Sequence, residues 1–190
     1  AGILSEGFGI SYAGQVVSGF DASAIEGNTP TASRAFIWRT LPEALRDPEM
    51  RLLNNLPGDV LGCAIAVTTF ETAGGYSSDG TTERAVIWDK SGMWDSTGEP
   101  KLLSDLLIAQ GLDVSAWTSL SRVTSLSDNG QTAAGWGVWA ADGSKRGFVA
   151  RSGNAVGACC LRSGLGTGTC VSTTSDGCAA RGGQYLGDGA

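Results

Sequence analysis

The cysteines are concentrated at one end of the chain. Four of the five lie in the last 32 residues, and they are Cys159, Cys160, Cys170 and Cys178. Four thiols could bind structural zinc, but zinc ligands normally come as two C-x2-4-C pairs, and the gaps here are none, nine and seven residues. A bridge between the adjacent Cys159 and Cys160 would be strained. The spacing favours two disulfides that link Cys159 and Cys160 to Cys170 and Cys178 in an extracellular protein, with Cys63 free and buried.

Aromatic side chains are the next candidates for chemistry, because their faces stack on sugar rings. The chain has six tryptophans. Trp38 and Trp88 lie in similar apolar strands, as core residues do. We therefore expect Trp94, Trp136 and Trp139 to be the ligand-binding candidates, with surface glycans as the ligand class.

Three aspartate turns could hold calcium, which prefers oxygen ligands. They are Asp79-Gly80, Asp128-Asn129-Gly130 and Asp142-Gly143. None follows the D-x-D-x-D-G pattern, and tight turns require the same residue types. We therefore predict turns here, with no metal site and no cofactor.

Catalytic chemistry is restricted by the absence of histidine, which excludes Ser-His-Asp triads and most catalytic zinc sites. A pair of carboxylates could hydrolyse glycosides, but no pair stands out by an apolar setting. We predict a non-enzymatic protein.

The composition describes a β-rich globular chain. Of 190 residues, 42% are hydrophobic, 17% are charged and 29 are glycine, which suggests a packed core with short strands and many turns. The net charge of −6 disfavours nucleic acid as a partner. No apolar run approaches the about 18 residues needed to span a membrane.

A repeat occurs three times along the chain. Residues 9–20 align with 125–136 at an offset of 116, and residues 71–76 match 15–20 at an offset of 56. Each copy is followed by a similar apolar strand, at 34–38, 84–88 and 146–150. Such self-similarity is typical of stacked or radially arranged units.

Two residue types recur with the repeat. A glycine precedes an aromatic in each hairpin, at Gly19, Gly75 and Gly135. This glycine predicts a bulge or a close approach of two backbones. An arginine begins each following strand, at Arg34, Arg84 and Arg146. We expect these arginines to pair with carboxylates of neighbouring units, with an anion-binding ring as the alternative.

These motifs resemble the extracellular HAF-repeat family of secreted bacterial proteins. Residues 11–19 are similar to the family's G-x-S-x-D-G-x-x-V-x-G hairpin, Arg34-Ala35-Phe36 to its His-Ala-Phe triplet, and residues 50–58 to its closing strand and turn. The resemblance covers about residues 7–151, and it implies four-stranded, propeller-like blades without catalytic residues. The family histidine is arginine in all three copies, so no role of that histidine carries over.

The tail resembles a second pattern of large secreted bacterial proteins, G-A-C-C … C … C … G-G-x-Y-x-G-D-G-x-x-C. It matches residues 157–189, and the last cysteine of the pattern is missing. We therefore predict two domains, a β-repeat domain over 1–156 and a Cys-rich disulfide module over 157–190.

The predicted fold class is mainly β, with about three antiparallel propeller-like units, one short helix over 102–110 and the disulfide-stapled tail. Met50–Leu53 is interpreted as a fourth strand, although Asp47-Pro48 also permits a helix. Buried positions are predicted for Trp38 and Trp88.

The third unit lacks a fourth strand, and an incomplete sheet leaves an edge that pairs with something. The terminal segment Ala1–Ile10 could complete the last unit in cis or be donated to another subunit. We predict self-association through terminal-strand pairing, as in a subunit of a bacterial surface layer or filament. The alternative is a glycan- or calcium-binding module of a larger secreted protein.

Overall fold

The computed structural model describes residues 4–27, 29–39, 49–92, 94–95, 97–152, 156–162, 168–174 and 184–188. After residue 152, Cys160 is the one residue whose side chain is described. The described residues form antiparallel sheets and one short helix, so the prediction of a mainly β protein is confirmed. The chain divides into two compact units, residues 1–150 and 151–190, and each is considered by itself.

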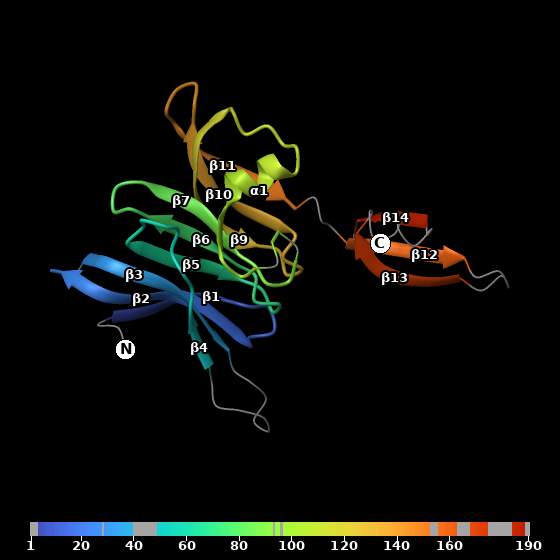
Figure 1. Ribbon diagram of the computed structural model, residues 1–190, viewed down its shortest axis with the longest axis horizontal. Helices are drawn as coiled ribbons and strands as arrows, with labels where there is room; N and C mark the ends of the chain where they lie inside the picture. The colour runs from blue at the N-terminus through green and yellow to red at the C-terminus, as the bar shows by residue number, and fades with distance from the viewer. Residues whose placement is uncertain are drawn as a thin grey trace. The chain divides into compact units, whose positions relative to one another are not determined.

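Three antiparallel hairpins begin the three sheets of the first unit (Figure 1). They join β1 (Leu4–Ile10) to β2 (Val16–Glu26), β5 (Leu61–Val67) to β6 (Ala73–Ser78), and β9 (Trp117–Leu126) to β10 (Thr132–Trp139). They coincide with the three copies of the sequence repeat. The hairpin predicted for each copy of the repeat is therefore confirmed.

The turn of the second hairpin is one residue shorter than the turns of the other two hairpins. The Ser11 amide donates to the Val16 carbonyl and the Ser127 amide to Thr132, whereas the Thr68 amide donates to Thr72, only four residues on. The second turn is thus one residue shorter, which explains why the repeat offset of 56 applies only after the turn.

A glycine in the second strand of each hairpin touches the neighbouring backbone. A Cβ added at Gly19, Gly75 or Gly135 would lie 1.8–1.9 Å from a carbonyl oxygen of the first strand. The register of each hairpin shifts near this contact. The predicted bulge or close backbone approach is therefore confirmed, and only glycine fits there without rearrangement.

The repeated Arg-containing segments form the third strand of each sheet. These strands are β3 (Thr29–Arg39), β7 (Glu83–Trp88) and β11 (Lys145–Arg151). The first two sheets add a fourth strand, β4 (Glu49–Leu52) and β8 (Pro100–Leu102). Strand β4 confirms the interpretation of Met50–Leu53. The third sheet has the order β11-β10-β9, and the described residues supply no fourth strand to it.

The single described helix, α1 (Leu103–Ala109), lies inside the predicted range 102–110. Leu103 and Leu107 are buried on one face of α1, in the core between the second and third sheets. Gly111 follows α1 at φ +80°, and its amide donates to the Ile108 carbonyl, as a glycine after a helix end does.

The amino-terminal segment corrects one expectation. Residues 4–10 form β1, which pairs antiparallel with β2 of the same chain, with Leu4 opposite Ala22 and Ile10 opposite Val17. The segment therefore completes the first sheet. It lies at the edge of that sheet and does not complete the third sheet, so the predicted completion of the last unit in cis is wrong. Pairing of this edge strand with another subunit stays a prediction.

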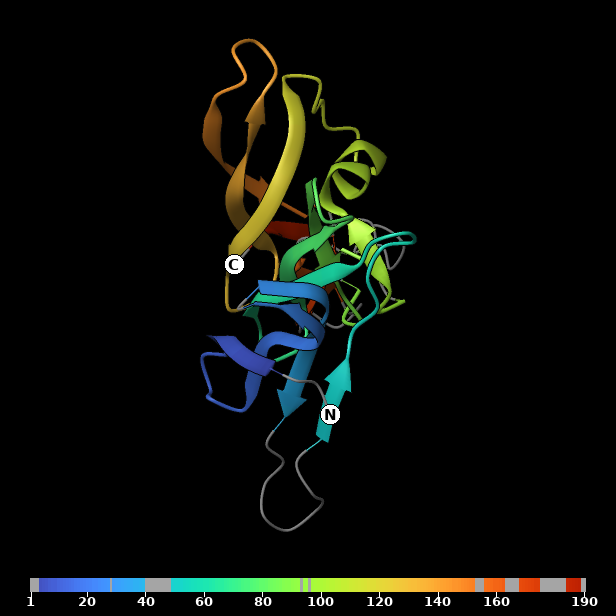
Figure 2. The same cartoon turned by 90° about the vertical axis from the view of Figure 1, so that its left-hand side faces the viewer.

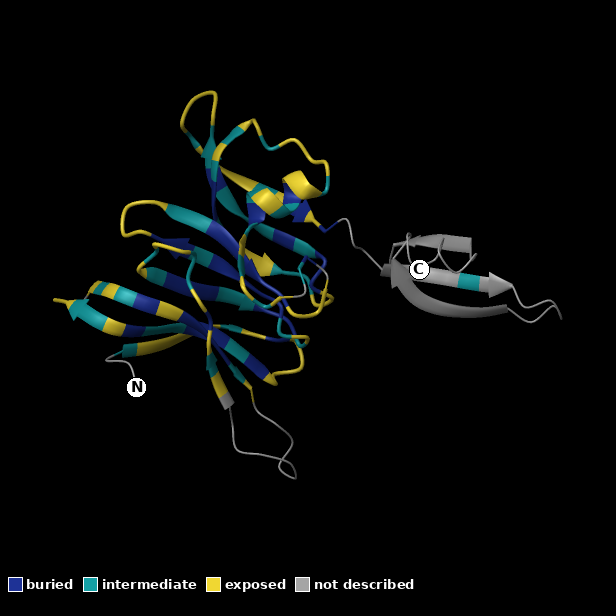
Figure 3. Ribbon diagram, in the orientation of Figure 1, coloured by how far each residue is buried: buried dark blue, intermediate teal, exposed yellow. Residues whose placement is uncertain are grey.

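The three sheets of the first unit stack in sequence order (Figure 1, Figure 2). One core cluster contains Ala35 and Ile37 of the first sheet with Val86 and Trp88 of the second. The next contains Ala85 and Ile87 of the second sheet with side chains of the third. The second sheet is therefore covered on both faces, and Figure 3 shows its strands largely buried.

The two repeat-equivalent tryptophans are not equally buried. Trp88 is 1% exposed and donates its Nε1 hydrogen to the Asn54 carbonyl at 2.8 Å. Trp38 is only half-buried, so the prediction of burial is wrong for Trp38. The reason is its place in the stack: Trp88 faces the first sheet, whereas the equivalent face of the first sheet has no preceding sheet in the unit.

The second unit is a three-stranded sheet of order β13-β12-β14, with β12 (Val156–Arg162), β13 (Gly168–Thr174) and β14 (Gln184–Asp188). In the β12–β13 register, Cys160 lies opposite Cys170. Cys160 is disulfide-bonded, and its partner is not among the described side chains. The pairing of the four tail cysteines stays a prediction.

Candidate functional site

The outer face of the first sheet is the first of two uncovered apolar surfaces. We call it the leading face, and it consists of Ile10, Val17, Trp38, Met50 and Leu52. Strand pairing places Ile10, Val17, Trp38 and Met50 in one row across β1, β2, β3 and β4. Ile10 is 67% exposed, whereas Val67, at the same position of the second hairpin, is 8% exposed.

The outer face of the third sheet is the second such surface. We call it the trailing face, and it consists of Ala134, Trp136, Val138, Lys145 and Val149. Val149 holds the position of Ile37 and Ile87 in the repeat. Those isoleucines are 2% and 0% exposed because the next sheet covers them, while Val149 is 77% exposed. The sequence did contain a signal for this surface: Val149 is an apolar residue at a repeat position that is buried in the first two sheets, although no later sheet in the unit covers it.

The joint between the second and third sheets shows how polar groups support the stacking. Arg122 of β9 donates to both carboxylate oxygens of Glu83 on β7, and its guanidinium lies 4.3 Å from the centroid of the Tyr76 ring. The hydrogen bonds to Glu83 raise the pKa of Arg122 despite its partial burial. Bidentate pairing and ring stacking suit arginine better than lysine.

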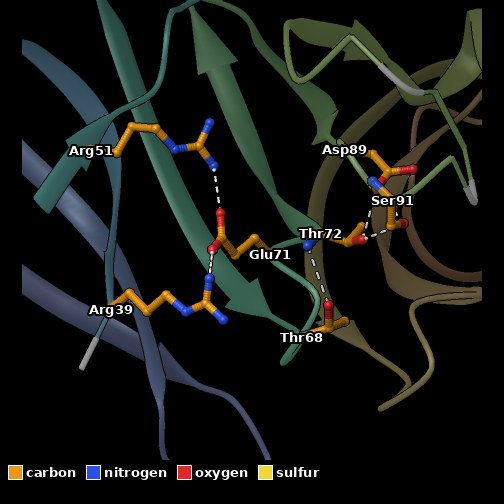
Figure 4. A network of polar contacts seen from close by, with 7 residues as sticks. All are labelled: Arg39, Arg51, Thr68, Glu71, Thr72, Asp89 and Ser91. Carbon is orange, nitrogen blue, oxygen red and sulfur yellow. Dashed lines mark hydrogen bonds and ion pairs between the residues drawn. The ribbon is translucent and has the colours of Figure 1, made fainter. Parts of the chain in front are cut away.

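The joint between the first and second sheets is made by Glu71 (Figure 4). Its carboxylate accepts from Arg39 at 2.8 Å and from Arg51 at 3.2 Å, so one turn of the second hairpin binds two strands of the first sheet. Glu71 has φ +63° and is the single non-glycine residue with positive φ among the described residues. Gly14 and Gly130 hold the equivalent position in the other two turns, also at positive φ.

Asp89 lies beside this turn and is fully buried (Figure 4). Its carboxylate accepts from the Thr72 hydroxyl at 2.9 Å, from the amide and hydroxyl of Ser91, and from the Trp94 amide at 2.8 Å. Burial opposes ionisation, but these hydrogen bonds outweigh it and hold the pKa of Asp89 below its ordinary value. Asp89 thus fixes the loop after β7.

A pocket of about 300 Å³ opens along the stacked first strands of the three sheets. Its lining is mostly apolar and comprises Phe8, Phe20, Cys63, Ile65, Tyr76, Arg122 and Thr124. Cys63 is free and buried, as predicted, and burial raises the pKa of its thiol to about 12. Burial also raises the pKa of Tyr76. The pocket can take an apolar group, but it presents neither a reactive thiolate nor a base.

The predicted ligand-binding tryptophans are not brought together on the surface. Trp94 is 4% exposed and donates to the Gly130 carbonyl at 2.7 Å, so it is a core residue, contrary to its expected surface position. Trp136 and Trp139 are half-buried. Lys145 lies 4.4 Å from the Trp136 ring and Arg146 lies 4.8 Å from the Trp139 ring, so a cation already contacts one face of each ring.

The expectation that the three repeated arginines pair with carboxylates of neighbouring units is wrong for Arg34 and Arg146. Arg84 pairs with Asp59, and Arg146 pairs with Asp142 at 2.8 Å. Arg34 donates to the Leu53 carbonyl and to the Asn54 side chain.

The aspartate turns hold hydrogen bonds of their own. Asp79 accepts from the Thr82 amide and from Thr81, which lowers its pKa to about 2, and Ser144 and Arg146 do the same for Asp142. Within the described part of the chain, no group of three or more His, Cys, Asp or Glu side chains is arranged to hold a metal ion. No described helix has the length and apolar character to cross a membrane.

Comparison with family models, curated proteins and solved structures found no match. The resemblance to the HAF-repeat family and to the Cys-rich tail pattern therefore stays a prediction. The functional argument depends on the leading and trailing faces.

Proposed function

We propose that this protein is a non-enzymatic, extracellular structural protein that self-associates, as a subunit of a bacterial surface layer or filament. One observation carries the proposal: Ile10 and Val149 are exposed at repeat positions whose counterparts pack against an adjoining sheet, since Val67, Ile37 and Ile87 are buried and Leu126 is partly buried in the core. Contiguous apolar faces on a small domain are typical of interaction sites. A second copy supplies the kind of sheet that these positions already accept within the chain.

The extracellular setting is supported by the tail. Cys160 is disulfide-bonded and lies opposite Cys170 in the sheet register, and disulfides persist in oxidising compartments. We propose that Cys159 and Cys160 bridge to Cys170 and Cys178. Mass spectrometry of the protein alkylated without reduction tests this: one free thiol, Cys63, is expected after unfolding, and four free tail thiols would contradict it.

The non-enzymatic character is supported by the side chains that could have done chemistry. The Cys63 thiol is kept protonated by burial, Arg122 is paired with Glu83, and Asp89 is saturated with hydrogen bonds. Arg122 thus joins the second and third sheets, and Asp89 fixes the loop after β7. The propeller-like arrangement implied by the HAF resemblance belongs to this proposal too, with each sheet acting as one blade.

Self-association is tested by sedimentation velocity and light scattering of the intact chain over a wide range of concentration. The expected result is an average mass that rises with concentration beyond a dimer. An Ile108→Asp variant is the control, because Ile108 is also exposed but lies on α1, away from both faces. A mass that stays monomeric at high concentration would overturn the proposal.

A further inference from the structure

We infer that copies of this chain stack head to tail, with the leading face of one copy on the trailing face of the next. The inference rests on the proposed self-association and assigns its geometry. Each new contact would repeat the packing that already joins the first sheet to the second and the second to the third.

The internal joints define which side chains would meet. In the first joint Ile37 belongs to the same core cluster as Trp88, and in the second Ile87 belongs to the same cluster as Ala150. The corresponding pair between copies is Val149 with Trp38. Val149 is one methylene smaller than Ile37, and Trp38 is the same residue type as Trp88, so the combined volume stays similar to that of the first joint.

The neighbouring rows match in the same way. Val67 and Ala73 of the second sheet bury against the first, and the leading face carries Ile10 and Val17 at these positions. Met50 and Leu52 extend the apolar area, at 45% and 39% exposed. The leading face therefore offers the apolar row that an adjoining sheet covers elsewhere in the chain.

Charge also matches across the proposed contact. Arg122 of the third sheet binds Glu83 of the second, and both positions recur in the repeat. Glu6 holds the position of Arg122, since Glu6 lies opposite Phe20 as Arg122 lies opposite Trp136. Lys145 holds the position of Glu83, one residue before the repeated arginine. Glu6 and Lys145 are exposed and opposite in sign, so the pair is reversed but retained.

The two faces are different surfaces, so the contact is heterologous. A heterologous contact that does not close on itself propagates into a filament. The inference therefore excludes a two-fold dimer that joins two leading faces or two trailing faces.

Two face-blocking variants of the full chain test the order of stacking. One is the double variant Ile10→Asp with Met50→Asp on the leading face, and the other is Val149→Asp on the trailing face. All three residues are exposed, and unchanged tryptophan fluorescence verifies folding. Each variant alone is expected to be monomeric, and an equal mixture is expected to give a heterodimer and nothing longer.

Other results overturn the inference in distinguishable ways. Dimers of Val149→Asp alone would indicate contact between two leading faces. Polymers of both variants equal to the unchanged chain would show that self-association uses another surface, which leaves the proposed function standing. An unchanged chain that is monomeric would overturn both.

Charge exchange tests the proposed ion pair. Glu6→Lys and Lys145→Glu are each expected to weaken association roughly 2- to 5-fold, as loss of a solvent-exposed pair does. The double variant with both changes is expected to regain the original association, because the pair is restored with its signs exchanged. Failure of the double variant to recover would overturn this pairing.

Discussion

Glu71 offers a direct measurement of what holds the first two sheets together. Its left-handed backbone conformation lowers the free energy of unfolding by about 1–2 kcal/mol for any residue with a Cβ. Glycine does not have this cost. Glycine instead lowers the free energy of unfolding by about 0.4–1 kcal/mol, because it gives the unfolded chain more conformational freedom. The net advantage of glycine at this position is therefore about 1 kcal/mol. Against it stand two partly exposed ion pairs, to Arg39 and Arg51, of about 0.2–1 kcal/mol each.

Two substitutions separate these contributions. Glu71→Ala keeps the strained backbone and loses both ion pairs, so it should lower the free energy of unfolding by about 0.4–2 kcal/mol. Glu71→Gly loses the same pairs but relieves the backbone, so it should be more stable than Glu71→Ala by about 1 kcal/mol. Gly14→Ala is the matched control. It imposes the strain at φ +68° with no atom within 4 Å of the new Cβ, and should destabilise by about 1 kcal/mol.

The assay is urea unfolding of the intact chain at low concentration, followed by tryptophan fluorescence. All six tryptophans lie at or before residue 139, so the signal reports the first unit. Equal stability of the alanine and glycine variants at position 71 would refute the argument from backbone strain. Unchanged stability of Glu71→Ala would refute the contribution of the two ion pairs.

Three further outcomes are expected. Ile87→Ala should destabilise the first unit by about 2–5 kcal/mol because Ile87 is fully buried, while Val149→Ala should change stability by less than about 0.5 kcal/mol, both measured by urea unfolding. The pKa values of Asp79 and Asp142 are about 2 in the folded chain and about 4 when unfolded, so their contribution is complete above about pH 5 and is lost as the pH falls toward 2. Urea midpoints between pH 2 and 7 check this, and a midpoint that rises on acidification would contradict it. Cys63 should react with a thiol reagent at pH 8 only after unfolding, and rapid labelling of the folded protein would show that its thiol is accessible.

Local elements were predictable because neighbouring residues determine them. The three hairpins, the bulge glycines such as Gly75, the fourth strand at Met50 and the helix beginning at Leu103 follow from turn residues, repeat spacing and apolar periodicity. The repeat strengthened each of these predictions, because the same pattern had to serve three times.

The placement of individual side chains was less predictable. Trp94 was expected at the surface because it lies outside the repeated apolar strands, yet the carboxylate of Asp89 draws its loop into the core. Trp38 has a local sequence very similar to that of Trp88, but only Trp88 has a neighbouring sheet packed against it. Burial depends on what lies across a sheet face, and sequence spacing within one strand does not report it.

The sequence by itself determined the β architecture, the three repeated hairpins and the short helix, since turn chemistry and glycine requirements act over a few residues. The tertiary structure decided that β1 completes the first sheet, that Glu71 joins two sheets across a strained turn, and that Val149 is exposed where Ile37 and Ile87 are buried. The physical reason is that stacking order sets which faces are covered. Identical positions in a repeat acquire different burial only because a stack of three sheets has a first face and a last face.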